Sequence, residues 1–248
     1  MKNIVYLFLL ITSLIFAQNG FETGNDFYKK AQYDKAIVAY EKVLQTDKKQ
    51  SVELYFNLGN CYYKLNKVAP AIYNYEKALV LNPNDKETLN NLKFAQKKTI
   101  DEIKVIPKVG FGKLVRDFTG THTYNTWAWI SVGFALFFLV FFLGYYFTQA
   151  AVYKRIFFFG MFVLLFLILI SVTAAFFEKS HFDLEKPAIV FAESTEVKSE
   201  PQKANPAIFI LHEGTKVYVL QSLDNWKKVQ LTDGSEGWIE NSAIKEVK

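Results

Sequence analysis

Two long apolar runs dominate the pattern of hydrophobic and polar positions along this chain. Residues 127–147 and 156–177 contain no charged side chain, and Arg155 and Glu178 bound the second run. At about 1.5 Å per residue, a helix of either length crosses a hydrocarbon core of roughly 30 Å. Because a bilayer gives the backbone no hydrogen-bond partner, we expect two transmembrane helices. The alternative is a buried core helix of a soluble protein, which ordinarily has a shorter apolar run.

The residues beside these runs predict an orientation. The short connection over residues 148–155 carries Lys154 and Arg155 and no acidic residue. Short loops rich in Lys and Arg stay in the cytoplasm, so both long flanks are expected on the outer side. Aromatic residues are typical of the two membrane interfaces. They are Tyr124, Trp127 and Trp129 at the outer interface and Tyr145, Tyr146 and Tyr153 at the inner one.

The first residues are typical of a secretory signal peptide, over residues 1–17. Lys2 precedes an apolar stretch, Ile4–Phe16, and Ala17 is a suitable cleavage residue. An uncleaved anchor is the alternative, and both interpretations place the following residues outside the cytoplasm. Cys61 is the only cysteine, so the chain forms no intramolecular disulfide. We expect Cys61 to be a small packing residue between helices.

A short amphipathic pattern lies in the linker, residues 101–126. Phe111, Leu114, Val115 and Phe118 follow the spacing of one helix face. We expect this helix to lie in the outer membrane interface. Packing against the N-terminal region is the alternative.

Small residues four positions apart predict where the two spans approach each other. The pairs are Ser131 with Ala135 and Ser171 with Ala175. Such pairs let helix backbones come close in a membrane. The spans contain no ionisable residue, which argues against a transport path within this chain.

An internal repeat precedes the linker. Residues 24–44 align without gaps with residues 59–79 at a period of 35, and ten of the 21 positions are identical. Small residues are expected where two helices cross closely, and large residues are expected to fill the space around them. The identical pairs are Gly24/Gly59, Asn25/Asn60, Tyr28/Tyr63, Lys29/Lys64, Ala36/Ala71, Ile37/Ile72, Tyr40/Tyr75, Glu41/Glu76, Lys42/Lys77 and Leu44/Leu79.

This pattern resembles the tetratricopeptide repeat, with two units and a capping helix over residues 18–100. The resemblance implies stacked helical hairpins whose concave face binds peptides or protein segments. It implies that the groove is lined by Asn25, Tyr28, Lys29, Asn60, Tyr63 and Lys64. Some family members clamp a C-terminal carboxylate with asparagines and basic residues, but here Phe21 and Phe94 stand where those members are basic. Ordinary repeat packing is the alternative role of the Asn and Tyr residues.

Residues 187–248 alternate between polar and apolar positions, which predicts antiparallel β-structure. The expected strands are Ala207–Leu211, Thr215–Leu220, Trp226–Leu231 and Gly237–Ile239, with a hairpin turn at Asp233-Gly234. The region resembles the bacterial SH3-like domain, although its first-strand motif, Glu196–Pro201, lacks the usual Arg and Gly. The resemblance implies a small barrel in which Trp226 and Trp238 form an aromatic surface for peptide or cell-wall material. Packing of these tryptophans in a small core is the alternative.

Composition excludes several function classes. The net charge is +5, and arginine occurs only at positions 116 and 155. That balance does not favour nucleic-acid binding or bidentate phosphate recognition. His122, His181 and His212 are far apart, and the sequence has no Cys/His cluster, glycine-rich phosphate loop or nucleophile elbow. We therefore predict no catalytic residue, no metal, no cofactor and no enzyme activity.

The predicted fold class is a multidomain membrane protein with all-α tetratricopeptide hairpins, a two-helix transmembrane hairpin and an all-β SH3-like barrel. This order resembles tetratricopeptide-repeat membrane proteins encoded in the aerotolerance operons of Bacteroides-type bacteria. The resemblance implies the bacterial cytoplasmic membrane, two periplasmic domains, and von Willebrand-type membrane proteins as partners. It also implies a non-enzymatic scaffold in envelope or oxidative-stress tolerance. The alternatives are a peptidoglycan- or envelope-sensing binding protein and a subunit of a transport complex.

Overall fold

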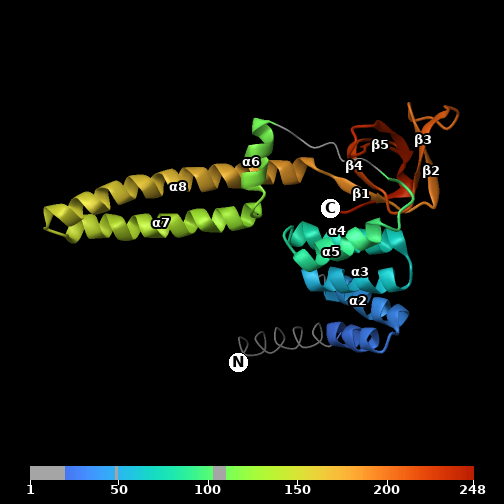
Figure 1. Ribbon diagram of the computed structural model, residues 1–248, viewed down its shortest axis with the longest axis horizontal. Helices are drawn as coiled ribbons and strands as arrows, with labels where there is room; N and C mark the ends of the chain where they lie inside the picture. Colours follow the sequence, from blue (N-terminus) through green and yellow to red (C-terminus); the bar gives the residue numbers. More distant parts are fainter. Residues whose placement is uncertain (1–19, 48–49, 103–109) are drawn as a thin grey trace, which may run out of the picture. The chain divides into compact units, whose positions relative to one another are not determined.

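The computed structural model describes residues 20–47, 50–102 and 110–248, and the predicted signal peptide lies outside them (Figure 1). The chain divides into two compact units. One joins Met1–Ile106 with Lys186–Lys248, and the other is Pro107–Glu185. Helical repeats, two long apolar helices and a C-terminal antiparallel sheet confirm the predicted multidomain fold class.

The first unit begins with a set of helices, which we call the repeat layer. Its members are a helix over residues 20–29, α2 (Tyr33–Asp47), α3 (Val52–Lys64), α4 (Val68–Leu81) and α5 (Lys86–Gln96). Ser51 and Asp85 begin α3 and α5 as N-caps, since their side-chain oxygens accept backbone amides of the first turn. The layer thus contains two helical hairpins followed by a single helix (Figure 1).

Glycine allows the two helices of each hairpin to cross closely. A Cβ at Gly24 would lie 2.4 Å from the ring of Tyr40, and a Cβ at Gly59 would lie 2.5 Å from the ring of Tyr75. Both tyrosines are buried. A larger side chain at either glycine would displace the ring that fills the hairpin core, which explains why both positions are glycine in the two repeats.

Seven antiparallel strands form the C-terminal sheet, in the order β3-β2-β6-β5-β4-β1-β7. The strands are β1 (Pro187–Val190), β2 (Ser194–Lys198), β3 (Ala207–His212), β4 (Lys216–Leu223), β5 (Trp226–Gln230), β6 (Glu236–Glu240) and β7 (Ile244–Glu246). Their inward side chains enclose one core, which includes Val197, Val217, Val229 and Ile239. Gly234 has a φ of +87° in the β5–β6 turn, in agreement with the Asp-Gly hairpin signal.

The strands β1 and β7, which the sequence pattern did not reveal, attach the sheet to the repeat layer. Ile189 of β1 and Val247, just after β7, share a buried core with Val68, Ala69 and Ile72 of α4. These three α4 side chains are at most 7% exposed. The repeat layer and the sheet therefore share a common core within the first unit.

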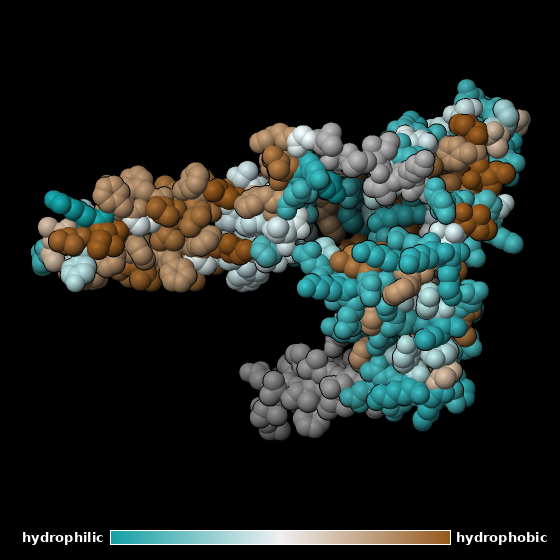
Figure 2. All heavy atoms as spheres, in the orientation of Figure 1, coloured by the Kyte–Doolittle hydropathy of each residue, from teal (hydrophilic) through white to brown (hydrophobic). Residues whose placement is uncertain are grey.

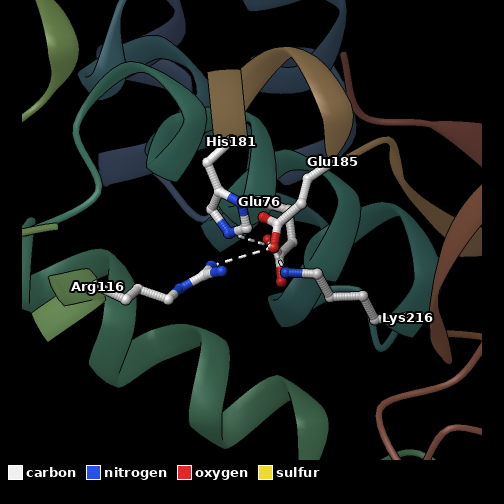
Figure 3. Close-up of polar contacts among 5 residues, drawn as sticks. All are labelled: Glu76, Arg116, His181, Glu185 and Lys216. Atoms are coloured by element: carbon white, nitrogen blue, oxygen red, sulfur yellow. Dashed lines mark hydrogen bonds and ion pairs between the residues drawn. The ribbon is translucent and has the colours of Figure 1, made fainter. Parts of the chain in front are cut away.

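The carboxylate of Asp101 stabilises the same interface between the repeat layer and the sheet. Asp101 accepts hydrogen bonds from the backbone amide of His212 at 2.7 Å and from the hydroxyl of Thr215 at 2.6 Å. Its second oxygen lies 2.7 Å from Nδ1 of the His212 imidazole. Desolvation opposes ionisation of Asp101, but these hydrogen bonds outweigh it and lower the pKa of the carboxyl below its ordinary value. Nearby, Lys216 forms a 2.7 Å ion pair with buried Glu76 of α4 (Figure 3).

The second unit contains α6 (Phe111–Thr119), α7 (Tyr124–Phe147) and α8 (Ala151–Leu184). α7 and α8 pack along each other as an antiparallel helical hairpin, joined by residues 148–150. Both are long and apolar enough to cross a bilayer, and Figure 2 shows their mostly hydrophobic outer surface. The helical hairpin is therefore compatible with a membrane-spanning element. α8 extends beyond the predicted span, 156–177, at both ends.

Glycine and phenylalanine interlock where α7 meets α8. A Cβ at Gly144 would lie 2.7 Å from the ring of Phe157, and a Cβ at Gly160 would lie 2.3 Å from the ring of Phe141. The two rings also contact each other edge to face, with centroids 5.6 Å apart. In each helix, the missing side chain of a glycine thus leaves room for a phenylalanine ring of the other helix.

The small-residue contact predicted from the sequence is only partly observed. Ser171 is buried, but Ala135 is exposed. The alanine that is buried on α8 is Ala174, whereas Ala175 is half-buried. With 3.6 residues per turn, neighbouring residues point about 100° apart, so a four-residue spacing alone did not locate the contacting face.

Helix α6 has the predicted amphipathic pattern. Phe111, Leu114 and Phe118 are 80, 67 and 50% exposed. An uncovered apolar face on a short helix that precedes a long apolar hairpin is the arrangement expected of an interfacial helix.

Two contacts fix α6 to the helical hairpin. Trp127 of α7 is buried and donates a hydrogen bond from Nε1 to the carbonyl of Thr119 at 2.8 Å. Arg116 of α6 and His181 of α8 both reach the carboxylate of Glu185, at 3.1 and 3.0 Å (Figure 3). These contacts set the position of α6 at one end of the hairpin.

Gly160→Ala is expected to destabilise the helical hairpin by about 1–3 kcal/mol, because the added Cβ meets the ring of Phe141. The measurement is the midpoint of SDS-induced unfolding in mixed micelles. Gly133→Ala on α7 is the matched control, because no atom lies within 4 Å of its added Cβ. The control should leave the midpoint unchanged or raise it, since alanine favours helix over glycine. Equal losses for the two variants would contradict the interlocked packing.

Asp101→Asn is expected to weaken the attachment of the sheet to the repeat layer by about 1.5–3 kcal/mol, the usual contribution of hydrogen bonds to a charged group. The measurement is the free energy of urea unfolding of the full chain at neutral pH. Asp26→Asn, at an exposed position of the first helix, is the control and should change little. Equal stability of Asp101→Asn and the wild type would show that the carboxylate does not hold the interface.

The stabilising effect of Asp101 should disappear in acid. Because its pKa is lower in the folded chain than in the unfolded chain, the contribution is complete above the unfolded value of about 3.9. It is lost as the pH falls through the folded pKa. The difference in unfolding free energy between the wild type and Asp101→Asn should therefore shrink below about pH 4. A difference that stays constant down to about pH 2 would refute this assignment.

Candidate functional site

One surface of the repeat layer carries a small pocket, which we call the repeat groove. It has a volume of about 240 Å³ and is formed by the first helix, α3, α4 and α5. Four of the six residues predicted for a peptide groove lie together in it, whereas Asn25 and Lys29 do not line it. Its lining residues are Tyr28, Asn60, Tyr63, Lys64, Tyr75, Asn91 and Phe94.

A hydrogen-bond network holds Asn60 in the repeat groove. Its Oδ1 accepts the hydroxyl of Tyr75 at 2.7 Å and Nδ2 of Asn91 at 2.8 Å. Burial is the main cause that raises the pKa of Tyr75, so the hydroxyl stays protonated and can donate. Because two internal donors occupy the Oδ1, the amide nitrogen of Asn60 is the atom that can donate to a ligand.

The same network occurs one repeat earlier. Oδ1 of Asn25 accepts the hydroxyl of Tyr40 at 2.6 Å and Nδ2 of Asn57 at 3.1 Å. The repeated Asn and Tyr residues therefore have a structural role in addition to any role in the groove. Asn57 and Asn91 were not selected from the sequence, although they stand 34 residues apart, close to the repeat period.

Positive charge borders the repeat groove. Lys64 lines it and is exposed. Nζ of Lys98 lies 4.2 Å from the centre of the Tyr63 ring and 2.9 Å from Oδ1 of Asn66. Lysines next to an amide donor and aromatic rings suit the carbonyl and carboxylate oxygens of a peptide. Phe94 adds an exposed apolar surface where a basic residue would make a carboxylate clamp.

The two tryptophans predicted as an SH3-like surface lie on the same face of the β5–β6 pair. Trp238 pairs with Lys228, and Trp226 is two residues away from Lys228 along β5. Val229 and Ile239 point to the opposite face, into the core. Trp226 is only 9% exposed, whereas Trp238 is half-buried. Trp238 therefore offers more area to a ligand than Trp226.

Two features of the described residues bear on metal binding and on nucleophilic chemistry. Among the residues that the structure describes, no group of three or more His, Cys, Asp or Glu side chains is placed to hold a metal ion. Cys61 is completely buried in the core of the repeat layer, and burial raises the pKa of its thiol to about 12. A thiol with that pKa is not a nucleophile at neutral pH.

Comparison with known families identifies both modules of the first unit. Residues 24–66 match the TPR repeat, and residues 52–85 match the tetratricopeptide repeat. Residues 194–246 match the bacterial SH3 domain. A search of curated proteins finds no match. Tetratricopeptide repeats mediate protein–protein interactions, the SH3 domain indicates a second binding role, and both are typically non-catalytic.

Cys61 is expected to resist thiol–disulfide exchange in the folded chain, because its thiol is buried and protonated. A chromogenic disulfide reagent at neutral pH should react with no thiol until urea unfolds the repeat layer. It should then react with one equivalent per chain, since Cys61 is the only cysteine. Reaction of the native protein at the rate of a free thiol would contradict this packing.

Proposed function

We propose that this protein is a non-enzymatic, membrane-anchored scaffold whose repeat groove binds an extended segment of a partner protein. The observation that carries the proposal is the grouping of Asn60, Tyr63 and Lys64 in one pocket. It combines an amide donor, an aromatic wall and a positive charge in a repeat that mediates protein–protein interactions. Peptide backbone and side chains supply the complementary acceptors and apolar groups.

The helical hairpin is the proposed anchor in the bacterial cytoplasmic membrane. Lys154 and Arg155, at the start of α8, favour a cytoplasmic position of the connection between the helices. The repeat layer and the SH3-like sheet then lie in the periplasm. The exposed apolar face of α6 supports a place for this helix in the outer interface.

The partners we propose are von Willebrand-type membrane proteins of an aerotolerance operon. The support is the order of the segments, which resembles that of tetratricopeptide-repeat membrane proteins from such operons. The scaffold would hold these partners together in a complex that acts in envelope or oxidative-stress tolerance.

A cell-wall-binding role is the second candidate function. The match to the bacterial SH3 domain and the half-buried Trp238 favour it. Under this alternative, the full-length protein would bind isolated peptidoglycan, and Trp238→Ala would lose that binding. Changes in the repeat groove would leave peptidoglycan binding intact.

Tyr63→Ala/Lys64→Ala is expected to reduce the capture of partner proteins at least about tenfold, which corresponds to a loss of about 1.4 kcal/mol of binding free energy. The measurement is quantitative cross-linked co-purification from native membranes at matched expression. Asn60 is left in place, because its replacement would remove the acceptor of the buried Tyr75 hydroxyl.

The control for this experiment is Lys42→Ala, at an exposed position of α2 that does not line the repeat groove. It should capture the same proteins as the wild type. Identical sets of captured proteins for the groove variant, the control and the wild type would exclude the repeat groove as the working surface.

A further inference from the structure

A second pocket of the first unit lies where the repeat layer meets the C-terminal sheet. We call it the composite pocket, because α2, α3 and α4 form most of it and the sheet supplies Phe191 and Lys245. Its volume is about 250 Å³. It shares no lining residue with the repeat groove.

Apolar and aromatic side chains form part of the lining of the composite pocket, beside polar and charged ones. Leu58 and Tyr55 of α3 are buried and contribute to its lining. Tyr73 of α4 contacts Phe191 edge to face, with ring centroids 5.6 Å apart. The aromatic pair spans the two modules, so the docked sheet completes a pocket that the helices mostly form.

Two ammonium groups converge at this aromatic pair. Nζ of Lys77 lies 5.6 Å and Nζ of Lys245 lies 4.7 Å from the centre of the Tyr73 ring. Neither lysine forms an ion pair with a carboxylate of the described residues. Burial, and then the charge of Lys245, lower the pKa of Lys77. An anion between the two lysines would offset the repulsion between their positive charges.

A carboxylate also lines the composite pocket, but it already has a donor. Glu41 accepts the hydroxyl of Tyr62 at 2.7 Å. Two lysines and one glutamate leave the pocket with an excess of positive charge. Its complement is therefore a ligand that combines an apolar group with one negative charge.

We propose that the composite pocket binds the C-terminal residue of a partner polypeptide. The apolar or aromatic side chain would lie among Tyr55, Tyr73 and Phe191, and the carboxylate between Lys77 and Lys245. The volume is below the range of about 300–1,000 Å³ that is usual for small-molecule sites, which suits a single side chain. Among the residues of a polypeptide, the C-terminal one alone carries an apolar side chain and a free carboxylate on the same Cα.

At the positions that build this site, the two repeats differ in the residue equivalent to Tyr73 and in the burial of the lysine equivalent to Lys77. The residue equivalent to Tyr73 in the first repeat is Val38, which is 68% exposed. The residue equivalent to Lys77 is Lys42, which is also exposed. The second repeat therefore has an aromatic wall and a half-buried lysine where the first has an open surface.

The test uses the full chain in nanodiscs and fluorescein-labelled tetrapeptides, Gly-Ser-Gly-Phe with a free C-terminal carboxylate and the same peptide as its C-terminal amide. Fluorescence anisotropy should show saturable binding of the acid and at least about tenfold weaker binding of the amide. Gly-Ser-Gly-Gly with a free carboxylate should also bind at least about tenfold more weakly, because it leaves the aromatic interior empty. An amidated peptide with an internal Phe-Asp pair should also bind at least about tenfold more weakly, and binding as tight as that of the acid would overturn the proposal, because an internal side chain would then supply the charge.

Lys77→Gln/Lys245→Gln should abolish the preference for the acid over the amide. Lys42→Gln, the equivalent position of the first repeat, is the matched control and should retain it. The proposal is overturned by equal binding of acid and amide, by a preference that survives the double substitution, or by no binding of the acid at about 1 mM. It is also overturned if Tyr63→Ala/Lys64→Ala abolishes binding and Lys77→Gln/Lys245→Gln does not, since the peptide then occupies the repeat groove.

Discussion

The burial of α4 on more than one side is the constraint on which the first unit depends. Ala78 belongs to the core shared with α2 and α3, whereas Ile72 belongs to the core shared with α5 and the sheet. A helix with apolar side chains on all sides is stable in water only when other elements pack against all of those sides. The two charged residues of α4 are both used at the interface, since Glu76 pairs with Lys216 and Lys77 borders the composite pocket.

The shared core constrains how often the segment between the repeat layer and the sheet can cross a membrane. The hairpin is inserted between the repeat layer and the sheet, which belong to one unit. With α7 and α8 in a bilayer, the antiparallel pair returns the chain to the side that it left. A single span would place the repeat layer and the sheet on opposite sides of the membrane and separate the core of α4. If α7 and α8 lie in a bilayer, the segment between the repeat layer and the sheet must therefore cross it an even number of times, whichever side the first unit occupies.

Much of the architecture could be predicted from the sequence because its signals can be found in the order of residues alone. The long apolar runs and the Asp-Gly turn depend on neighbouring positions, and the 35-residue period is found when the chain is aligned with itself. The docking of the sheet could not be predicted in the same way, because Asp101 and His212 are 111 residues apart. Even so, the sequence of α4 indicated that more than one of its sides is buried. It has only two charged residues in 14, whereas α2 has five in 15: Asp34, Lys35, Glu41, Lys42 and Asp47.

The candidate site was predicted in the same partial way. Repeat identity selected Asn60 and Tyr63, but it selected Asn25 equally, which does not line the repeat groove. Identity between the repeats could not show whether an asparagine contacts a ligand or accepts the hydroxyl of Tyr40 or Tyr75, because one asparagine side chain can do both. Strand alternation placed Trp226 on a face of the sheet, but it could not show that this side chain is covered.

If the composite pocket binds a ligand as proposed, that binding is thermodynamically linked to the docking of the sheet on the shared core. A ligand that binds only the docked form stabilises it by about 2.7 kcal/mol at a concentration of 100 times its Kd. That is comparable with the value of about 1.5–3 kcal/mol expected from the hydrogen bonds of Asp101. By reciprocity, a change that loosens the sheet from α4 must weaken binding in the composite pocket by the same coupling free energy. Under the proposal for the composite pocket, the attachment of the sheet is therefore a variable that a partner can set as well as a feature of the fold.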